Sequence, residues 1–207
     1  MIDKSRVTTI LFDLGGVLIQ LHGKPFKQIW LPDGKIDAGV WSHWKRSDTV
    51  QRFESGQIGG SQFAREFIDE VGLLVEEDEF IEHFMRWPAR LFPGVPAMLA
   101  ELAQTYRLAA LSNSNALHWP MIMQDMHLQE YIPNCISSHQ IRVMKPDRRA
   151  FEAALQCLDL QPGMVLFLDD LQASIDIARE LGMQAVKVTG TVGGVETVRS
   201  LGLLSDF

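Results

Sequence analysis

The sequence contains few cysteines and fewer basic than acidic residues. Cys135 and Cys157 are the only cysteines among 207 residues, and they show neither close pairing nor metal-ligand spacing, which excludes a disulfide framework and a structural zinc site. With 26 acidic against 19 basic residues, the formal net charge is -7. Nucleic acid and anionic lipid favour clustered positive charge. We therefore expect a small soluble molecule as the partner, and neither nucleic acid nor a membrane. The low cysteine content fits a protein of the reducing cytoplasm.

Long hydrophobic runs are also missing. No stretch reaches the about 18 apolar residues of a membrane-spanning helix. The first residues, MIDKSR, lead into a short apolar stretch without a small-residue cleavage site, so we expect neither membrane insertion nor export. The chain is 46% hydrophobic, which suffices to bury one full core. We expect one compact unit, as a monomer or a homodimer.

Short apolar runs alternate with amphipathic helical patterns in most of the chain. The run TTILFDL at Thr8 to Leu14 stops at a turn marked by Gly15 and Gly16, which indicates a buried strand. Strands separated by helices of about ten residues pair in parallel through right-handed crossovers. We therefore predict an α/β fold with a doubly wound parallel sheet. The further predicted strands are Leu108–Ser112, Cys135–Ser138, Val165–Asp169 and Ala185–Val188, and the clearest helical patterns begin near Val95 and Phe151.

The segment 19–92 interrupts this alternation. Its apolar periodicity is helical, for example at Phe63, Phe67 and Val71, and it contains no convincing strand. We predict an inserted helical lobe over 19–92 and a core formed by residues 1–18 and 93–207.

Polar residues follow three of the predicted strands at their carboxyl ends. Asp13 comes after ILF, Ser112 and Asn113 come after AAL, and Asp169 and Asp170 come after VLFL. Ligands of doubly wound sheets bind at this edge, and carboxylates that converge there repel one another unless a cation compensates them. Mg²⁺ prefers oxygen ligands and binds carboxylates together with phosphate. A lone Asp is often a helix N-cap, but that does not explain the paired Asp169 and Asp170.

Four motifs together resemble the haloacid dehalogenase superfamily of hydrolases, most of whose members are phosphatases. They are ILFDLGGVL at 10–18, LSNSN at 111–115, MKPD at 144–147 and LFLDD at 166–170, and the resemblance covers essentially the whole chain. It implies a Rossmann-like core and a helical cap that closes over the active site. The DLGGV variant, the LSNSN run and RFESGQIGGSQF in the lobe are most similar to the branch containing α-D-glucose-1-phosphate phosphatases.

The resemblance implies roles for individual residues. Asp13 would be a nucleophile that forms an aspartyl-phosphate, which water then hydrolyses, and Lys145 would add positive charge to the phosphate and to Asp13. Splitting the displacement into two steps makes each one easier. The hydroxyl of Ser112 and the backbone N–H of Asn113 would hold phosphate oxygens. The implied ligands of Mg²⁺ are Asp13, Asp169, Asp170 and the carbonyl of Gly15.

Two positions depart from the family pattern. Phosphatases of the superfamily usually carry a second Asp two residues after the nucleophile, where it protonates the leaving oxygen and later activates water, but this chain has Gly15. A sugar 1-phosphate would tolerate the loss, because its anomeric oxygen leaves with a lower pKa than an ordinary alcohol, and bound water would then suffice. Ser174 stands where relatives often have Asn or Asp, which implies a looser metal site.

Substrate specificity is expected to depend on the lobe. Glu54 lies in a turn that should face the site, and we predict that it binds substrate. Trp41, Trp44, Arg86 and Trp87 are candidates for a sugar pocket, although tryptophans spaced like Trp41 and Trp44 are more often packing residues. The six histidines show no ligand spacing, so surface or packing roles are expected for them.

The leading hypothesis is a phosphatase that acts on a phosphosugar or a similar small monoester. Gly15 and Ser174 motivate an alternative, a non-catalytic phosphate-binding or regulatory protein of the same fold. A 2-haloacid dehalogenase is a weaker alternative, because carbon–halogen displacement needs no divalent metal and would leave Asp169 and Asp170 unexplained. A phosphomutase would depend on the missing acid and base.

Overall fold

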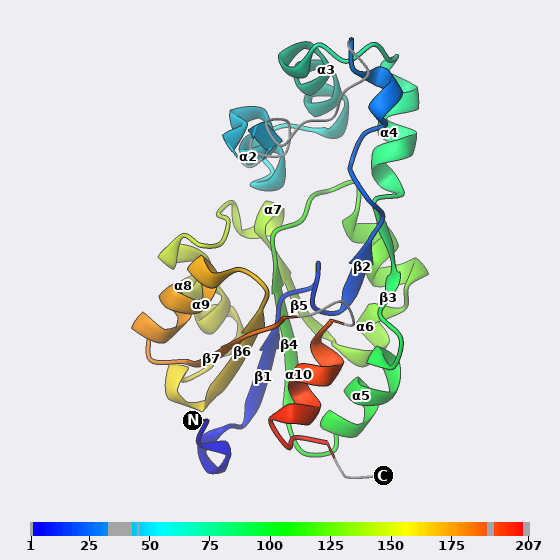
Figure 1. The fold of residues 1–207 in the computed structure, drawn as a ribbon. Helices are drawn as coiled ribbons and strands as arrows, with labels where there is room; N and C mark the ends of the chain where they lie inside the picture. Colours follow the sequence, from blue (N-terminus) through cyan, green and yellow to red (C-terminus); the bar gives the residue numbers. More distant parts are fainter. Residues whose placement is uncertain (1, 33–42, 45, 190–192, 205–207) are drawn as a thin grey trace.

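The computed structural model describes residues 2–32, 43–44, 46–189 and 193–204. Its centre is a five-stranded parallel sheet with the strand order β5-β4-β1-β6-β7, and helices lie on both faces (Figure 1). The predicted doubly wound α/β fold is confirmed. The strands are β1 (Thr9–Phe12), β4 (Arg107–Ser112), β5 (Asn134–Ser137), β6 (Val165–Asp169) and β7 (Gln184–Lys187).

The central strands are apolar on both sides because both faces of the sheet are covered. Side chains alternate along a strand, so Ile10 and Phe12 pack in one hydrophobic cluster and Leu11 packs in the other. Every residue of β1 and β6 is buried, as expected for covered parallel strands. The first cluster includes α5 (Val95–Leu102), α6 (Leu128–Tyr131) and α10 (Gly194–Ser200), and the second includes α8 (Arg148–Leu158) and α9 (Gln172–Glu180).

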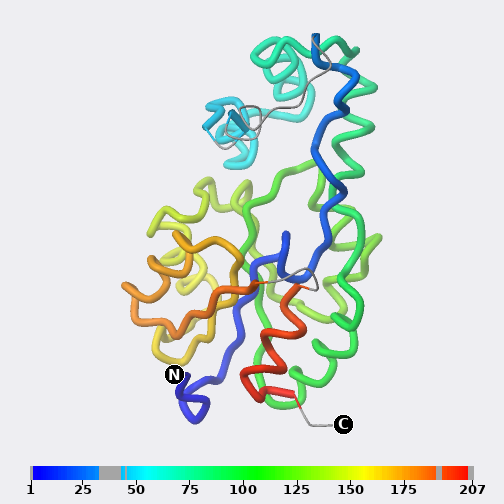
Figure 2. The backbone as a smooth tube through the Cα atoms, in the orientation of Figure 1, coloured from blue at the N-terminus to red at the C-terminus, as the bar shows by residue number. Residues whose placement is uncertain are grey.

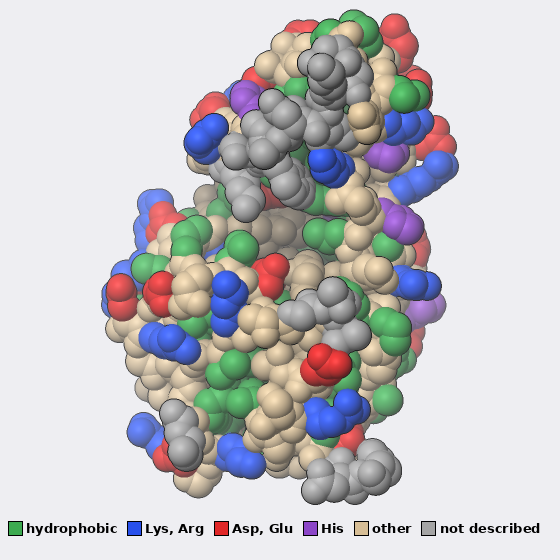
Figure 3. All heavy atoms as spheres, viewed as in Figure 1, with side chains coloured by type: hydrophobic (Ala, Val, Ile, Leu, Met, Phe, Trp, Pro, Cys, Tyr) green, Lys and Arg blue, Asp and Glu red, His purple; other side chains and the backbone are tan. Residues whose placement is uncertain are grey.

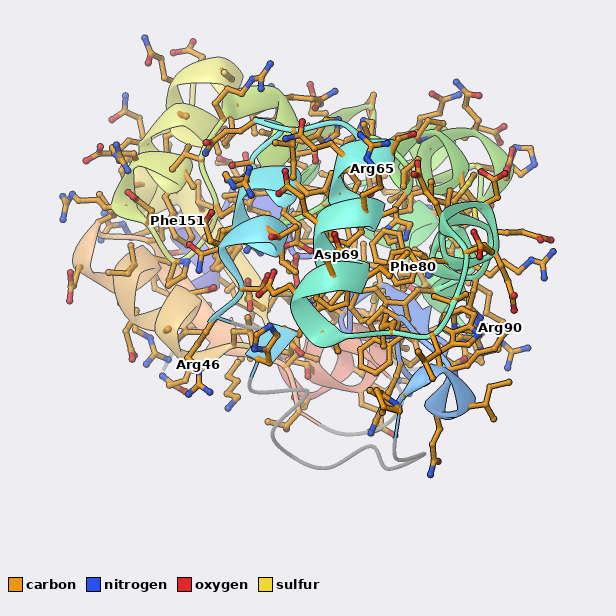
Figure 4. The ribbon with its side chains drawn as sticks, turned by 90° about the horizontal axis from the view of Figure 1, so that it is seen from above. Arg46, Arg65, Asp69, Phe80, Arg90 and Phe151 are labelled. Atoms are coloured by element: carbon orange, nitrogen blue, oxygen red, sulfur yellow. The ribbon has the colours of Figure 1, made fainter. Side chains whose placement is uncertain are left out.

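A second lobe lies above the carboxyl edge of the sheet (Figure 1). It has an aromatic cluster of its own, in which the rings of Phe53 and Phe63 stack with centroids 4.2 Å apart. Seen from above, α2 and α3 lie over the strands, and Arg65 and Asp69 occupy the exposed side of α3 (Figure 4). The elements of the lobe are η2 (Gln28–Trp30), α2 (Asp48–Glu54), α3 (Gly60–Val71) and α4 (Glu77–Met85).

The prediction that 19–92 contains no strand is wrong. β2 (Ile19–Leu21) and β3 (Pro88–Leu91) form a two-stranded antiparallel ribbon in which Ile19 lies opposite Leu91. The ribbon makes the two chain crossings between sheet and lobe run side by side (Figure 2). Its strands are three and four residues long, too short for their residue pattern to indicate a strand, so only their pairing identifies them.

No helix in the described ranges combines the length and the apolarity of a membrane span.

Candidate active site

The carboxylates of Asp13, Asp169 and Asp170 lie together at the carboxyl edge of the sheet. β1 and β6 are parallel neighbours, and Asp13 extends their ladder, because its backbone N–H donates to the carbonyl of Leu168 with an N···O distance of 2.8 Å. Asp169 is fully buried at the end of β6, and Asp170 is half-buried. One ligand oxygen from each carboxylate lies within 4.8 Å of the other two. The topology therefore brings together the three acidic residues that the sequence singles out.

Lys145 places a buried ammonium group between two of these carboxylates. Its Nζ lies 2.8 Å from Oδ1 of Asp13 and 2.6 Å from Oδ2 of Asp169. The Asn113 side chain fixes the Lys145 backbone, because its amide donates to the Lys145 carbonyl and its Oδ1 accepts from the Lys145 N–H, both at 2.8 Å. The sequence predicts only a backbone role for Asn113, so this positioning of Lys145 is an addition.

Burial and crowded charge shift the pKa values of this cluster. Burial raises the pKa of Asp13 to about 6, with Lys145 opposing the rise and Asp169 and Asp170 adding to it. Burial and the charge of Asp169 raise the pKa of Asp170. Burial disfavours the charge of Lys145, but the carboxylates of Asp13 and Asp169 outweigh it and raise the lysine pKa. The single positive charge of Lys145 therefore does not balance the negative charge that three ionised carboxyl groups would carry.

The donor set fits a divalent cation. Mg²⁺ takes oxygen ligands and usually binds one or two carboxylates together with phosphate oxygens. Its charge would offset both the burial and the mutual repulsion that raise the pKa of Asp13 and Asp170. Gly16 keeps room for this arrangement: its φ is +76°, and a Cβ there would lie 2.8 Å from Oδ2 of Asp170.

A cavity of about 100 Å³ opens next to this cluster, between the sheet edge and the lobe. Gly15, Ser112 and Asn113 line it from the sheet, whereas Glu54 and Trp87 line it from the lobe and its neck. The surface is hollowed between the two parts of the molecule (Figure 3). The cavity thus unites four of the predicted site residues, since Gly15, Glu54, Ser112 and Asn113 all face it.

Glu54 reaches the cavity because the end of α2 docks on α7 (Ser138–Ile141) of the core. The hydroxyl of Ser138 donates to the Glu54 carbonyl at 2.6 Å. Two residues later, the guanidinium of Arg142 donates to the carbonyl of Gly56. Gly56 has a φ of +68°, and a Cβ there would lie 2.4 Å from the His139 carbonyl oxygen. Only glycine fits this contact without strain.

The Glu54 carboxyl group is half-buried. Burial, and then the negative charge of Asp13, raise its pKa to about 7. Within the described residues, no hydrogen bond or ion pair engages this carboxyl group, whereas the backbone of Glu54 is held by Ser138. The group is therefore available to a ligand in the cavity.

The predicted role in a sugar pocket is not supported for two candidates, Trp44 and Arg86, and a third candidate lies outside the described residues. Trp44 is buried in the aromatic cluster of the lobe, where it contacts Phe67 edge to face. Arg86 is exposed and pairs with Glu82. Neither lines the cavity. Trp41 lies outside the described residues.

Asn115 and His118 also face the cavity, although neither is predicted from the sequence as a site residue. His118 is buried, stacks on Phe84 of the lobe and donates from Nε2 to the Phe84 carbonyl at 2.8 Å. Burial lowers its pKa to about 4, with the Phe84 hydrogen bond opposing, so it is neutral at pH 7. Packing, one of its two expected roles, is the one observed. The spacing of Asn115 and His118, at i and i+3, is the signal in the sequence that could have indicated them.

Ser174, the second departure from the family pattern, is fully buried on α9. Its hydroxyl makes no hydrogen bond within the described part of the chain.

The parallel sheet, the acidic cluster at its carboxyl edge and the buried lysine together define a Rossmann-like domain whose donor set fits a divalent cation. A family model described as haloacid dehalogenase-like hydrolase matches residues 7–182. The chain belongs to this family.

Two curated relatives illustrate the range of proteins that contain this domain. The D-ribitol-5-phosphate phosphatase of Bacteroides thetaiotaomicron is 22% identical over 86% of this chain and 90% of its own length. The mouse acyl-CoA dehydrogenase family member 10 is 24% identical over 93% of this chain, which spans only 19% of that protein. The chain therefore matches nearly the whole of one relative but less than a fifth of the other.

A solved structure supports the fold. A HAD-family enzyme of Bacteroides thetaiotaomicron, in complex with magnesium and inorganic phosphate, superposes with a TM-score of 0.75 at 21% identity. The match covers 88% of this chain and 94% of that one.

Proposed function

We propose that the protein is a magnesium-dependent phosphatase that hydrolyses a small phosphate monoester through an aspartyl-phosphate intermediate. The observation that carries this proposal is the ion-paired arrangement of Asp13, Lys145 and Asp169, with Asp170 beside it, at the ligand-binding edge of the sheet. Family membership and the phosphatase among the curated relatives support it.

Asp13 is the proposed nucleophile. Its carboxylate oxygen attacks phosphorus, the bond to the leaving oxygen breaks, and water then releases inorganic phosphate from the aspartyl-phosphate. Lys145 favours the ionised form of Asp13 and adds positive charge where the phosphoryl group would bind. The Ser112 hydroxyl and the Asn113 backbone N–H are proposed to hold phosphate oxygens, and both residues line the cavity.

Asp13, Asp169, Asp170 and the Gly15 carbonyl are proposed to hold Mg²⁺. The ion, when bound, neutralises charge on the phosphoryl oxygens. The convergence of the three carboxylates supports this ligand set, and the Bacteroides structure contains magnesium and phosphate.

The proposed substrate class is a sugar phosphate, with a sugar 1-phosphate favoured because Gly15 removes the usual proton donor. The cavity offers Asn115 as a polar contact and Trp87 as an apolar wall. We assign residues 19–92 to the cap and residues 1–18 and 93–207 to the catalytic core, in a cytoplasmic protein that is a monomer or a homodimer.

The test is phosphate release from a panel of sugar phosphates, with and without Mg²⁺, by wild type and Asp13→Asn. We expect release that requires the metal and falls by at least about 10³-fold in the variant, because the amide cannot form the intermediate. Full activity of Asp13→Asn, or activity unaffected by chelator, would refute the proposal.

Gly15 also favours a second candidate, a phosphate-binding protein without turnover. Tight binding of beryllium fluoride with Mg²⁺, combined with no hydrolysis across the panel, would select it. Dehalogenation is not favoured, because three converging carboxylates have no use in a metal-free displacement at carbon.

A further inference from the structure

We propose that Glu54, on the lobe, is the general acid and base of the reaction: it protonates the leaving oxygen and then activates the water. This inference rests on the proposed phosphatase function. A side chain of the protein would then supply the proton, in place of the bound water that the sequence alone suggests.

Shared access to one cavity is the first argument. Glu54 lines the same cavity of about 100 Å³ as Gly15, Ser112 and Asn113. Gly15 is the position from which the family's usual acid would act, and a Cβ there would meet nothing closer than Cδ1 of Leu21, at 3.8 Å. The space beside the nucleophile is therefore open to a carboxyl group that arrives from the opposite wall.

The second argument is that Glu54 is positioned but not engaged. Its backbone is held by Ser138, and the Gly56 that follows packs on His139 and accepts from Arg142. Its carboxyl group has no hydrogen bond or ion pair within the described residues. A proton donor must keep its carboxyl group free for the substrate, and the Glu54 carboxyl group meets this requirement.

The chemistry is balanced with Glu54 in this role. While Asp13 forms its bond to phosphorus, the bond from phosphorus to the leaving oxygen breaks, and that oxygen takes the proton of the Glu54 carboxyl group. The Glu54 carboxylate then takes a proton from water as the water oxygen attacks phosphorus. The bond to Asp13 breaks, inorganic phosphate leaves, and Glu54 carries its proton again. The raised pKa of Glu54 supports this role, because a general acid must hold its proton near the working pH.

The experiment compares Glu54→Gln with wild type on a series of alkyl and aryl phosphates in Mg²⁺. We expect kcat/KM for the alkyl esters to fall by about 10²–10³-fold, and for 4-nitrophenyl phosphate by less than about tenfold, because a good leaving group needs no proton. The dependence of rate on leaving-group pKa should therefore be steeper in the variant.

A second measurement follows the intermediate. With 4-nitrophenyl phosphate, Glu54→Gln should form the aspartyl-phosphate but hydrolyse it slowly, so acid-quenched protein should carry more covalent phosphate than wild type. Glu82→Gln is the control, since Glu82 is exposed on α4 and, among the described residues, pairs only with Arg86. It should match wild type in both measurements.

Equal losses on alkyl and aryl esters, with no added phosphoenzyme, would assign Glu54 to substrate binding and overturn the inference. Failure of the phosphatase function would look different: wild type itself would neither release phosphate nor form the intermediate.

Discussion

At the scale of single residues, the two glycines after Asp13 differ in their surroundings. A methyl group at Gly15 would make only an ordinary contact, 3.8 Å from Cδ1 of Leu21, but at Gly16 it would meet Asp170 with the backbone at φ +76°. We expect Gly15→Ala to change the free energy of unfolding by less than about 0.5 kcal/mol, and Gly16→Ala to lower it by about 1–3 kcal/mol. Urea unfolding of both variants measures this. Equal effects would show that Asp170 does not constrain Gly16.

The ionisation of Glu54 should affect stability in the metal-free protein. Its pKa in the folded state, about 7, lies above the ordinary value of 4.5, so the folded state binds more protons between these values. Its contribution is full below the unfolded pKa and is lost as pH rises through 7. Glu54→Gln, which mimics the neutral form, should match wild type at pH 4.5 and exceed its free energy of unfolding by about 1–3 kcal/mol at pH 8.

Urea unfolding in chelator at the two pH values measures this difference. A difference that does not change with pH would contradict the raised pKa. The comparison with wild type removes the contributions of other titrating groups, such as His118.

The place of a residue in the site was predictable where a strand of the sheet carries that residue to the carboxyl edge. Asp13, Asp169 and Asp170 follow strands that any apolar-run argument finds, and parallel pairing then brings them together. The hydrogen bonds between the Asn113 side chain and the Lys145 backbone were not predictable, because they join two loops 32 residues apart. The environment of Glu54 was not predictable either, because it depends on how the lobe docks.

At the scale of elements, the contact between the end of α2 and α7 depends on a glycine. Gly56→Ser would force a Cβ against the His139 carbonyl at a positive φ, whereas a Cβ at Gly59, which has φ -83° before α3, would meet no atom within 4 Å. We expect Gly56→Ser to lower kcat/KM by more than about tenfold, because small displacements of a positioned group are costly.

Gly59→Ser is the matched control and should keep wild-type activity, since serine is a favoured N-cap. Steady-state kinetics with Mg²⁺ and an alkyl phosphate, whose poor leaving group needs the proton, compare the two variants. Wild-type activity in both would mean that docking of α2 on α7 is unimportant for the reaction.

Most strands of the sheet were predicted to within one residue, and the apolar runs of β1 and β6 are continuous because both strands are buried throughout. β7, for instance, spans Gln184–Lys187 where the sequence predicts Ala185–Val188. β2 and β3 were missed, because a strand such as Ile19–Leu21 is defined by a partner near the far end of the inserted segment.

At the scale of the whole molecule, the sequence indicates two parts but not how one sits on the other. The aromatic cluster of the lobe and the two clusters of the sheet are separate cores. Their relative placement depends on a few polar contacts between distant residues, such as His118 with Phe84 and Ser138 with Glu54. Such contacts leave no periodic pattern in the sequence.

The paired ribbon of β2 and β3 limits how the lobe can be displaced. Two independent linkers would permit translation and rotation in every direction, but strands that hydrogen-bond to each other must bend and twist as one body. The register shift between Gln20 and Leu21 is where such bending meets the least resistance. We therefore expect displacement of the lobe to follow the bending and twisting of the ribbon, which would limit the paths by which the Glu54 carboxyl group can leave the cavity and return to it.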